Sequence, residues 1–97
     1  MNKLIISNLN KAFDSRIRLG IMSVLMVNDD ADFNTLKELL ELTDGNLASH
    51  IKALEGMEYI CSVKQFVGRK PNTRYSITEL GRESFQSHLN ALEQLIR

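Results

Sequence analysis

Small and polar residues recur at helical spacing in the middle of the chain, and their chemistry is recognition by hydrogen bonds. Asn46, Ser49 and Lys52 follow one another at intervals of three, so a helix would bring them to one face. An amide can hydrogen-bond a base edge, a hydroxyl can reach a base or a phosphate, and a lysine suits a phosphate. The opposite face is apolar at i, i+4 and i+7, with Leu47, Ile51 and Leu54. This pattern predicts a helix, about residues 46–58, that packs on a core and presents its polar face to duplex DNA.

Two neighbouring residues complete this face. Gly45 also points away from the core, and a small residue there would let a helix approach DNA closely. His50 lies nearer the boundary with the core. Taken singly, each of these residues fits an ordinary solvated helix face equally well, so the interpretation depends on the set.

A basic turn follows this helix. Residues 59–67 are rich in β-branched and aromatic side chains and alternate as a strand does, and residues 73–77 form a returning strand. Between them Gly68-Arg69-Lys70-Pro71-Asn72 has the composition of a turn. Arg69 and Lys70 at the tip and Arg74 on the return strand could touch phosphates or enter a minor groove. The alternative is a basic loop tip that only aids solubility.

Further segments have the apolar periodicity of helices. They cover about residues 4–13, 15–27, 36–42 and 78–96. Asp14 or Ser15 can cap the second of them, Asn34 or Thr35 the third and Thr78 the last. Asp32-Phe33 suits one extended pair, and Thr43-Asp44-Gly45 separates the third helix from the helix at 46–58.

The order of elements is therefore helix, helix, tight turn, helix, β-hairpin, helix. This order predicts a mainly α fold with a small β-hairpin (α+β), a winged helix-turn-helix with extra terminal helices for dimerisation. We expect a single domain over residues 1–97. It divides into an N-terminal dimerisation helix at 1–13, a winged-helix core at 14–77 with the wing at 68–73, and a C-terminal helix at 78–97.

Several ordered segments carry a resemblance to a known family. They are residues 14–19, 42–55, 59–60, 68–71, 73–75 and 77–82. Together they resemble the small MarR-like and ArsR-like winged-helix transcriptional regulators of bacteria and archaea, over about residues 13–85. The resemblance implies a homodimeric regulator that binds double-stranded DNA. Its recognition residues would be Asn46, Ser49, His50 and Lys52, and its wing contacts would be Arg69 and Lys70.

The chain also departs from these families. The thiol-rich metal-sensing motif of many ArsR-like sensors is absent, because Cys61 is the only cysteine. The long flanking helices that enclose a ligand pocket in full-length MarR proteins are mostly missing. A ligand-sensing role is therefore not part of the prediction.

Two apolar stripes lie outside the expected core. One is C-terminal, with Phe85, Leu89, Leu92 and Ile96; the other is N-terminal, with Leu4, Ile5 and Leu9. Pairing them across a two-fold axis would bury them and place two recognition helices about 34 Å apart, one turn of DNA. The alternative is that the two stripes pack on each other within one chain, and both contacts can coexist.

Composition limits the other classes of function. Twelve basic and twelve acidic residues give zero net charge, but residues 45–77 hold most of the basic side chains that would meet DNA. Neither a catalytic constellation nor a phosphate-binding glycine loop occurs, so we expect no enzyme, no cofactor and no metal site. The apolar run at residues 4–6 is too short for a signal peptide or a membrane span, which predicts a cytoplasmic protein.

The lone cysteine and the second histidine fit structural positions. We expect Cys61 to be a small buried hydrophobic residue of its strand, in preference to a redox switch. We expect His88, beside Leu89, to lie at the surface or at an interface. The sequence thus predicts a DNA-binding transcription regulator that represses by covering a promoter. The alternative is a winged-helix module that binds another protein without specific DNA binding.

Overall fold

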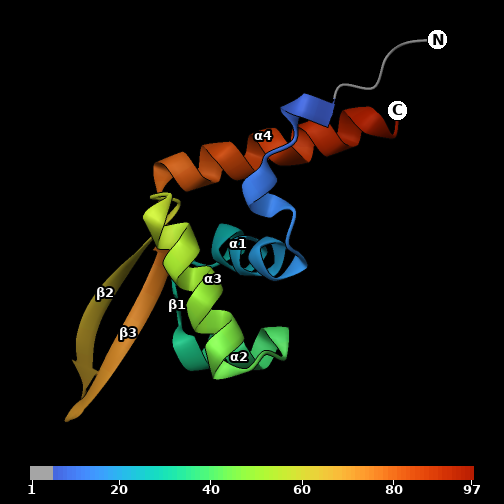
Figure 1. Ribbon diagram of the computed structural model, residues 1–97. Helices are drawn as coiled ribbons and strands as arrows, with labels where there is room; N and C mark the ends of the chain where they lie inside the picture. The colour runs from blue at the N-terminus through green and yellow to red at the C-terminus, as the bar shows by residue number, and fades with distance from the viewer. Residues whose placement is uncertain (1–5) are drawn as a thin grey trace.

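The computed structural model describes residues 6–97 and shows a group of helices from which a β-hairpin projects (Figure 1). Its helices are α1 (Arg16–Val27), α2 (Phe33–Leu40), α3 (Asp44–Gly56) and α4 (Glu79–Leu95). Its strands are β1 (Ala31–Asp32), β2 (Ile60–Val67) and β3 (Lys70–Ile77), in the antiparallel order β1-β3-β2. The predicted α+β class with a β-hairpin before the last helix is confirmed.

One hydrophobic core joins the three central helices to the sheet. Helix α1 packs against both α2 and α3, and the apolar face predicted for α3 is buried. The buried apolar residues are Phe13, Ile21, Met22, Leu25, Ala31, Leu36, Leu47, Ile51, Leu54, Ile60 and Phe85. Burial of one face of α3 leaves its other face to solvent.

The helix starts follow capping side chains. Ser15 caps α1 and Thr78 caps α4, as predicted. Helix α2 begins earlier than predicted because Asp32 caps it, accepting a hydrogen bond from the backbone N–H of Thr35 at 2.8 Å. Helix α3 also begins earlier, because Thr43 is its cap rather than part of a longer break.

The predicted helix at residues 4–13 is wrong where the structure describes it. Leu4 and Ile5 lie outside the described residues, and two 3₁₀ turns, η1 (Ile6–Asn8) and η2 (Lys11–Phe13), follow them. Asn10 separates these turns. Its backbone N–H donates to Nδ1 of His88 at 3.0 Å, its side-chain amide donates to the Tyr59 hydroxyl at 3.1 Å, and its Oδ1 accepts from the Ala12 N–H at 2.9 Å. Those bonds hold the segment in a shape that a continuous helix could not adopt.

Two residues of α4 are buried where we expected them to be exposed. His88 is only 3% exposed because it accepts the Asn10 bond and packs its ring on Phe13, so its predicted surface position is wrong. Phe85 is also 3% exposed, with its ring centroid 5.2 Å from that of Phe13. Phe85 therefore belongs to the core of the single chain, and its place in the predicted dimer stripe is wrong.

The rest of that stripe remains on the surface of α4. Leu89 is 37% exposed, Leu92 38% and Ile96 86%. The N-terminal turn η1 packs on α4 within the chain, and Leu9 is half-buried there. The intrachain contact that we left open is thus present, and an apolar strip is still exposed beside it.

The β-hairpin is a long two-stranded arm. Its register runs from Ile60 opposite Ile77 to Val67 opposite Lys70, so the turn holds only two residues, Gly68 and Arg69. Gly68 has a positive φ of 65°, a conformation that glycine adopts without strain. The turn is shorter than predicted, and β3 begins at Lys70.

Cys61 lies near the base of this arm and is exposed, so its predicted burial is wrong. The arm projects beyond the core, and both faces of β2 meet solvent after Ile60. Among residues 6–97, no helix is long and apolar enough to cross a membrane.

Candidate nucleic-acid interface

The outer face of α3 is polar and open. The four residues predicted to lie there are all exposed: Gly45, Asn46, Ser49 and Lys52. Asp44, the first residue of the helix, is paired with Lys37 of α2 at 2.8 Å. That ion pair offsets the charge of Asp44, while Glu41 lines the same surface hollow as Asn46. The structure thus brings the four predicted side chains to a single accessible surface.

His50 lies at the edge of this face and is half-buried. The Nε–H of Arg18, on α1, donates to His50 Nδ1 at 3.1 Å, and the Arg18 guanidinium also donates to the Ala12 carbonyl at 3.5 Å. Because Nδ1 is occupied by Arg18, the first role of His50 is to join α3 to α1. Any contact with DNA would use the rest of its ring.

Two arginines of α1 belong to this surface although the sequence analysis did not select them. Arg18 holds His50, and Arg16 lines the same surface hollow as Thr43 and Asn46. Both arginines lie in the first turn of α1, where the helix dipole disfavours cations. Two cations at a helix N-terminus are therefore a signal that could have pointed to an external anion.

The hairpin supplies the second basic element. Arg69 in the turn and Lys70 beside it are exposed, as is Lys64 on β2. Figure 1 shows that α3 ends and β2 begins at the same junction near α4, and that both elements extend from this junction away from α4. An eight-residue strand spans about 25 Å and a thirteen-residue helix about 20 Å. The hairpin tip therefore extends about as far as the N-terminal end of α3.

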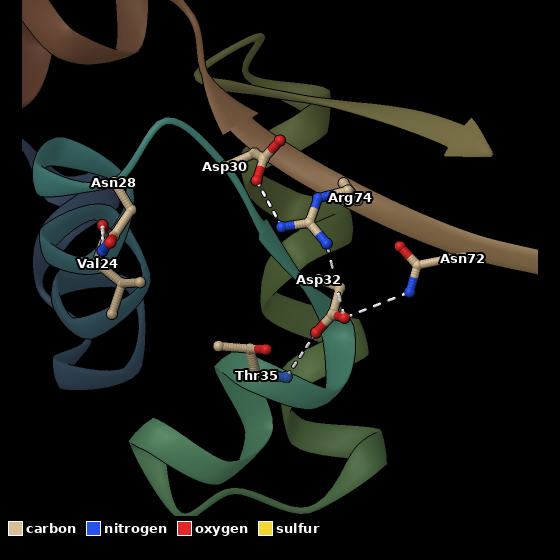
Figure 2. Close-up of polar contacts among 7 residues, drawn as sticks. All are labelled: Val24, Asn28, Asp30, Asp32, Thr35, Asn72 and Arg74. Carbon is tan, nitrogen blue, oxygen red and sulfur yellow. Dashed lines mark hydrogen bonds and ion pairs between the residues drawn. The ribbon is translucent and has the colours of Figure 1, made fainter. Parts of the chain in front are cut away.

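Arg74, predicted to contact DNA, is held by carboxylates of the protein instead (Figure 2). Its guanidinium lies 2.6 Å from Oδ1 of Asp30 and 3.9 Å from Oδ2 of Asp32. The same Asp32 oxygen accepts a hydrogen bond from the Asn72 amide at 3.3 Å, while Oδ1 of Asp32 caps α2 at Thr35. These contacts join β3 to the start of β1 and α2, so Arg74 braces the base of the hairpin.

Arg74 and the two aspartates that it contacts stabilise one another in their charged forms. The hydrogen bond from Arg74 lowers the pKa of Asp30 below its usual value and raises the pKa of Arg74 itself. The hydrogen bond from the backbone N–H of Thr35 is the main cause that lowers the pKa of Asp32. Both carboxylates are thus stabilised in the charged form. Among residues 6–97, no cluster of histidine, cysteine or acidic side chains could hold a metal ion.

These elements match a known family over most of the chain. The family model of the winged helix DNA-binding domain matches residues 17–96. The chain belongs to this family. The predicted winged helix-turn-helix fold, and the resemblance to small winged-helix regulators, are thereby confirmed, with α2 and α3 as the helix-turn-helix pair and the β2–β3 hairpin as the wing.

Individual proteins are similar to this one over nearly its whole length. Uncharacterized protein MJ0432 of Methanocaldococcus jannaschii is 36% identical over 85 residues, which are 88% of this chain and 92% of that protein. A transcriptional regulator homologue from Pyrococcus horikoshii OT3 is 34% identical, with a TM-score of 0.77 over 93% of this chain and 94% of that one. Reduced AbfR bound to DNA is 15% identical and shares the fold, with a TM-score of 0.76 over 92% of this chain and 62% of that one.

Proposed function

We propose that this protein binds specific sites on duplex DNA as a homodimer and represses transcription by covering a promoter. The recognition helix α3 would enter the major groove, and the tip of the wing would lie on the backbone or in the minor groove. The observation that carries this proposal is the division of α3 into two faces. Leu47, Ile51 and Leu54 are buried while Asn46 and Lys52 are exposed, which is the arrangement that a recognition helix requires.

Charge supports the same proposal. Lys52, Lys64, Arg69 and Lys70 make no ion pair with any residue in the described part of the chain. Uncommitted cations on a recognition helix and its wing are available to phosphates, which supply most of the affinity for DNA. The AbfR structure, which has this fold, is that of a DNA complex.

The exposed strip on α4 supports the dimer. Leu89 and Leu92 are in the C-terminal half of α4 and Ile96 follows it, and Figure 1 shows that this end of α4 lies away from the wing. Ile6 of η1, which packs on α4, is 68% exposed. Pairing two copies there would leave both recognition helices free on the other side of the assembly. Leu92→Glu should convert the dimer to a monomer in sedimentation and weaken DNA binding as well. A Leu92→Glu protein that stays dimeric would refute the assignment of this strip.

Fluorescence anisotropy tests DNA binding directly. The labelled duplexes would be one from the region upstream of the protein's own gene and one with that sequence scrambled, each titrated over a range of salt. We expect tighter binding to the native duplex and a linear fall of log K with log salt. No binding to either duplex at low salt would exclude this function and favour a module that binds another protein.

A pair of variants separates a specific surface from general charge. Lys52→Ala should weaken binding to both duplexes and reduce the salt slope by about 1, the effect of one phosphate contact. Asn46→Ala should instead reduce the preference for the native duplex, because an amide reads base edges. Arg97→Ala, at the far end of α4, removes the same charge as Lys52→Ala and should change neither quantity. Equal effects of Lys52→Ala and Arg97→Ala would count against the proposed surface.

A further inference from the structure

An aromatic side chain lies unprotected near the tip of the wing. The chain has four phenylalanines. Phe13 and Phe85 are 1% and 3% exposed and Phe33 is half-buried, whereas Phe66 is 74% exposed. A phenylalanine that meets mostly solvent adds little to the stability of its own fold. Its position calls for an explanation outside the single chain.

The strand register fixes the direction of this ring. Residues two apart share a face of a strand, so Phe66 lies on the same face as Ile60, and its cross-strand neighbour Pro71 lies on the same face as Tyr75. Ile60 is buried and Tyr75 packs on the core. The face that carries Phe66 is thus the face that packs on the core nearer the base of the hairpin. At Phe66 this face extends beyond the core.

That face looks toward the recognition helix. Strand β2 packs against α3, and Ile60 and Tyr75, on this face of the hairpin, meet the core that α3 helps to form. Phe66 lies six positions after Ile60, which is a distance of about 20 Å along a strand. This is about the length of α3, and Figure 1 shows that α3 and the hairpin diverge from a common junction, with the hairpin tip standing free. Phe66 therefore lies on the core-facing side of the wing, beyond the end of the core.

Cations precede and follow Phe66 along the hairpin, although Lys70, opposite Val67, belongs to the other face. Lys64 shares its face of β2, and Arg69 and Lys70 form the adjoining tip, all of them exposed. An apolar group between cations fits a surface that is itself apolar and flanked by anions. The minor groove has that chemistry, because its walls are phosphate backbones and an opened base step presents apolar base faces between them.

We propose that Phe66 inserts from the minor groove into a base step beneath the wing and bends the DNA there. The cations of the tip would hold the phosphates on either side, and Pro71 would support the ring from the neighbouring strand. Opening a step costs least at flexible pyrimidine–purine steps such as TA. The wing would thus add a sequence preference at a position where it forms no base hydrogen bond. This inference rests on the proposed binding of DNA.

The test compares variants of the full chain on end-labelled duplexes, with energy transfer between the ends reporting the bend. One duplex carries TA at the step under the wing, and its partner carries AA. Phe66→Ala should abolish the bend and lower affinity for the TA duplex about 5- to 150-fold, the range for loss of one aromatic stacked on a base. It should leave the salt slope unchanged. Lys70→Ala should keep the bend and reduce the slope by about 0.9.

Two further variants control for shape and for exposure. Val63→Ala removes an apolar side chain that is 59% exposed on the other face of β2, and it should behave as the wild type does. Phe66→Leu keeps an apolar wedge and should retain part of the bend. Thermal melts of each variant would check that the fold is kept.

Each outcome decides one question. Wild-type protein that binds no duplex would overturn both the proposed function and this inference. Normal binding with an unbent duplex, or equal bending by Phe66→Ala, would overturn this inference alone. Loss of self-association in Phe66→Ala, with the bend unchanged, would show that the ring joins protein to protein and would overturn the DNA role.

Discussion

The first turn of α4 crosses the end of the α3–β2 connection so closely that residue 81 has no room for a side chain. A Cβ added to Gly81 would lie 2.0 Å from the carbonyl oxygen of Tyr59 and 2.8 Å from its carbonyl carbon. Ordinary C···O contacts are about 3.3 Å or longer. Gly81→Ala therefore requires α4 or the connection to shift by about 1 Å.

The size of the effect follows from what that shift would break. The backbone N–H of Thr78 donates to the same Tyr59 oxygen at 3.0 Å, and the Thr78 hydroxyl donates to the Glu58 carbonyl at 2.7 Å. Overpacking costs about 1–3 kcal/mol, and two lost hydrogen bonds cost about 1 kcal/mol each. The higher helix propensity of alanine returns about 1 kcal/mol. The expected loss in the free energy of unfolding is about 2–4 kcal/mol.

Urea unfolding of the full chain would measure this loss, with all proteins at one concentration because dimerisation would make stability depend on it. Gly56→Ala is the matched control, since Gly56 also lies in a helix and its added Cβ would meet nothing within 4 Å. That control should be as stable as the wild type or slightly more so. A Gly81→Ala protein with the same midpoint as Gly56→Ala would refute the reasoning.

Two other predictions concern the brace of the wing and the N-terminal segment. Because the pKa values of Asp30 and Asp32 are lowered by folding, their stabilisation is present above the unfolded-state pKa near 4 and is lost as pH falls through the folded-state values. Arg74→Ala should reduce this acid sensitivity, measured as the difference between urea midpoints at pH 7 and pH 3; an unchanged difference would contradict the assignment. Asn10→Ala removes two side-chain hydrogen bonds and should cost about 1–2 kcal/mol in the same assay. The exposed Asn8, changed to alanine, should cost little, and equal losses would count against the role of Asn10.

The sequence alone predicted the parts of the fold that depend on interactions between residues close together in the chain. The apolar spacing of Leu47, Ile51 and Leu54 predicted which face of α3 is buried. Ser15 and Thr78 marked the starts of α1 and α4, because a hydroxyl before a helix caps its free N–H groups. Periodicity and capping act within a few residues, so one sequence is enough to detect them.

The errors arose where distant residues decide the conformation. Asn10 bonds to His88, 78 positions away, and no local pattern shows that this contact turns an apparent helix into two short turns. Arg74 looked like a free cation of the wing because Asp30 lies 44 residues earlier. The prediction that Cys61 is interior failed because Cys61 lies on the face of β2 opposite buried Ile60, and alternation separates the two faces of a strand without showing which one the core covers.

The two-residue turn of the wing also restricts how this arm can change in length during evolution or design. One residue added to each strand would lengthen the arm by about 3.3 Å, but it would move the tip position that Phe66 holds to the opposite face. A longer wing that still presents an aromatic ring on the side of α3 must therefore gain two residues in each strand, four in all. Insertions of two residues in each strand between the core and the Phe66–Pro71 pair should thus be tolerated by function better than insertions of one in each strand, although both preserve the hairpin.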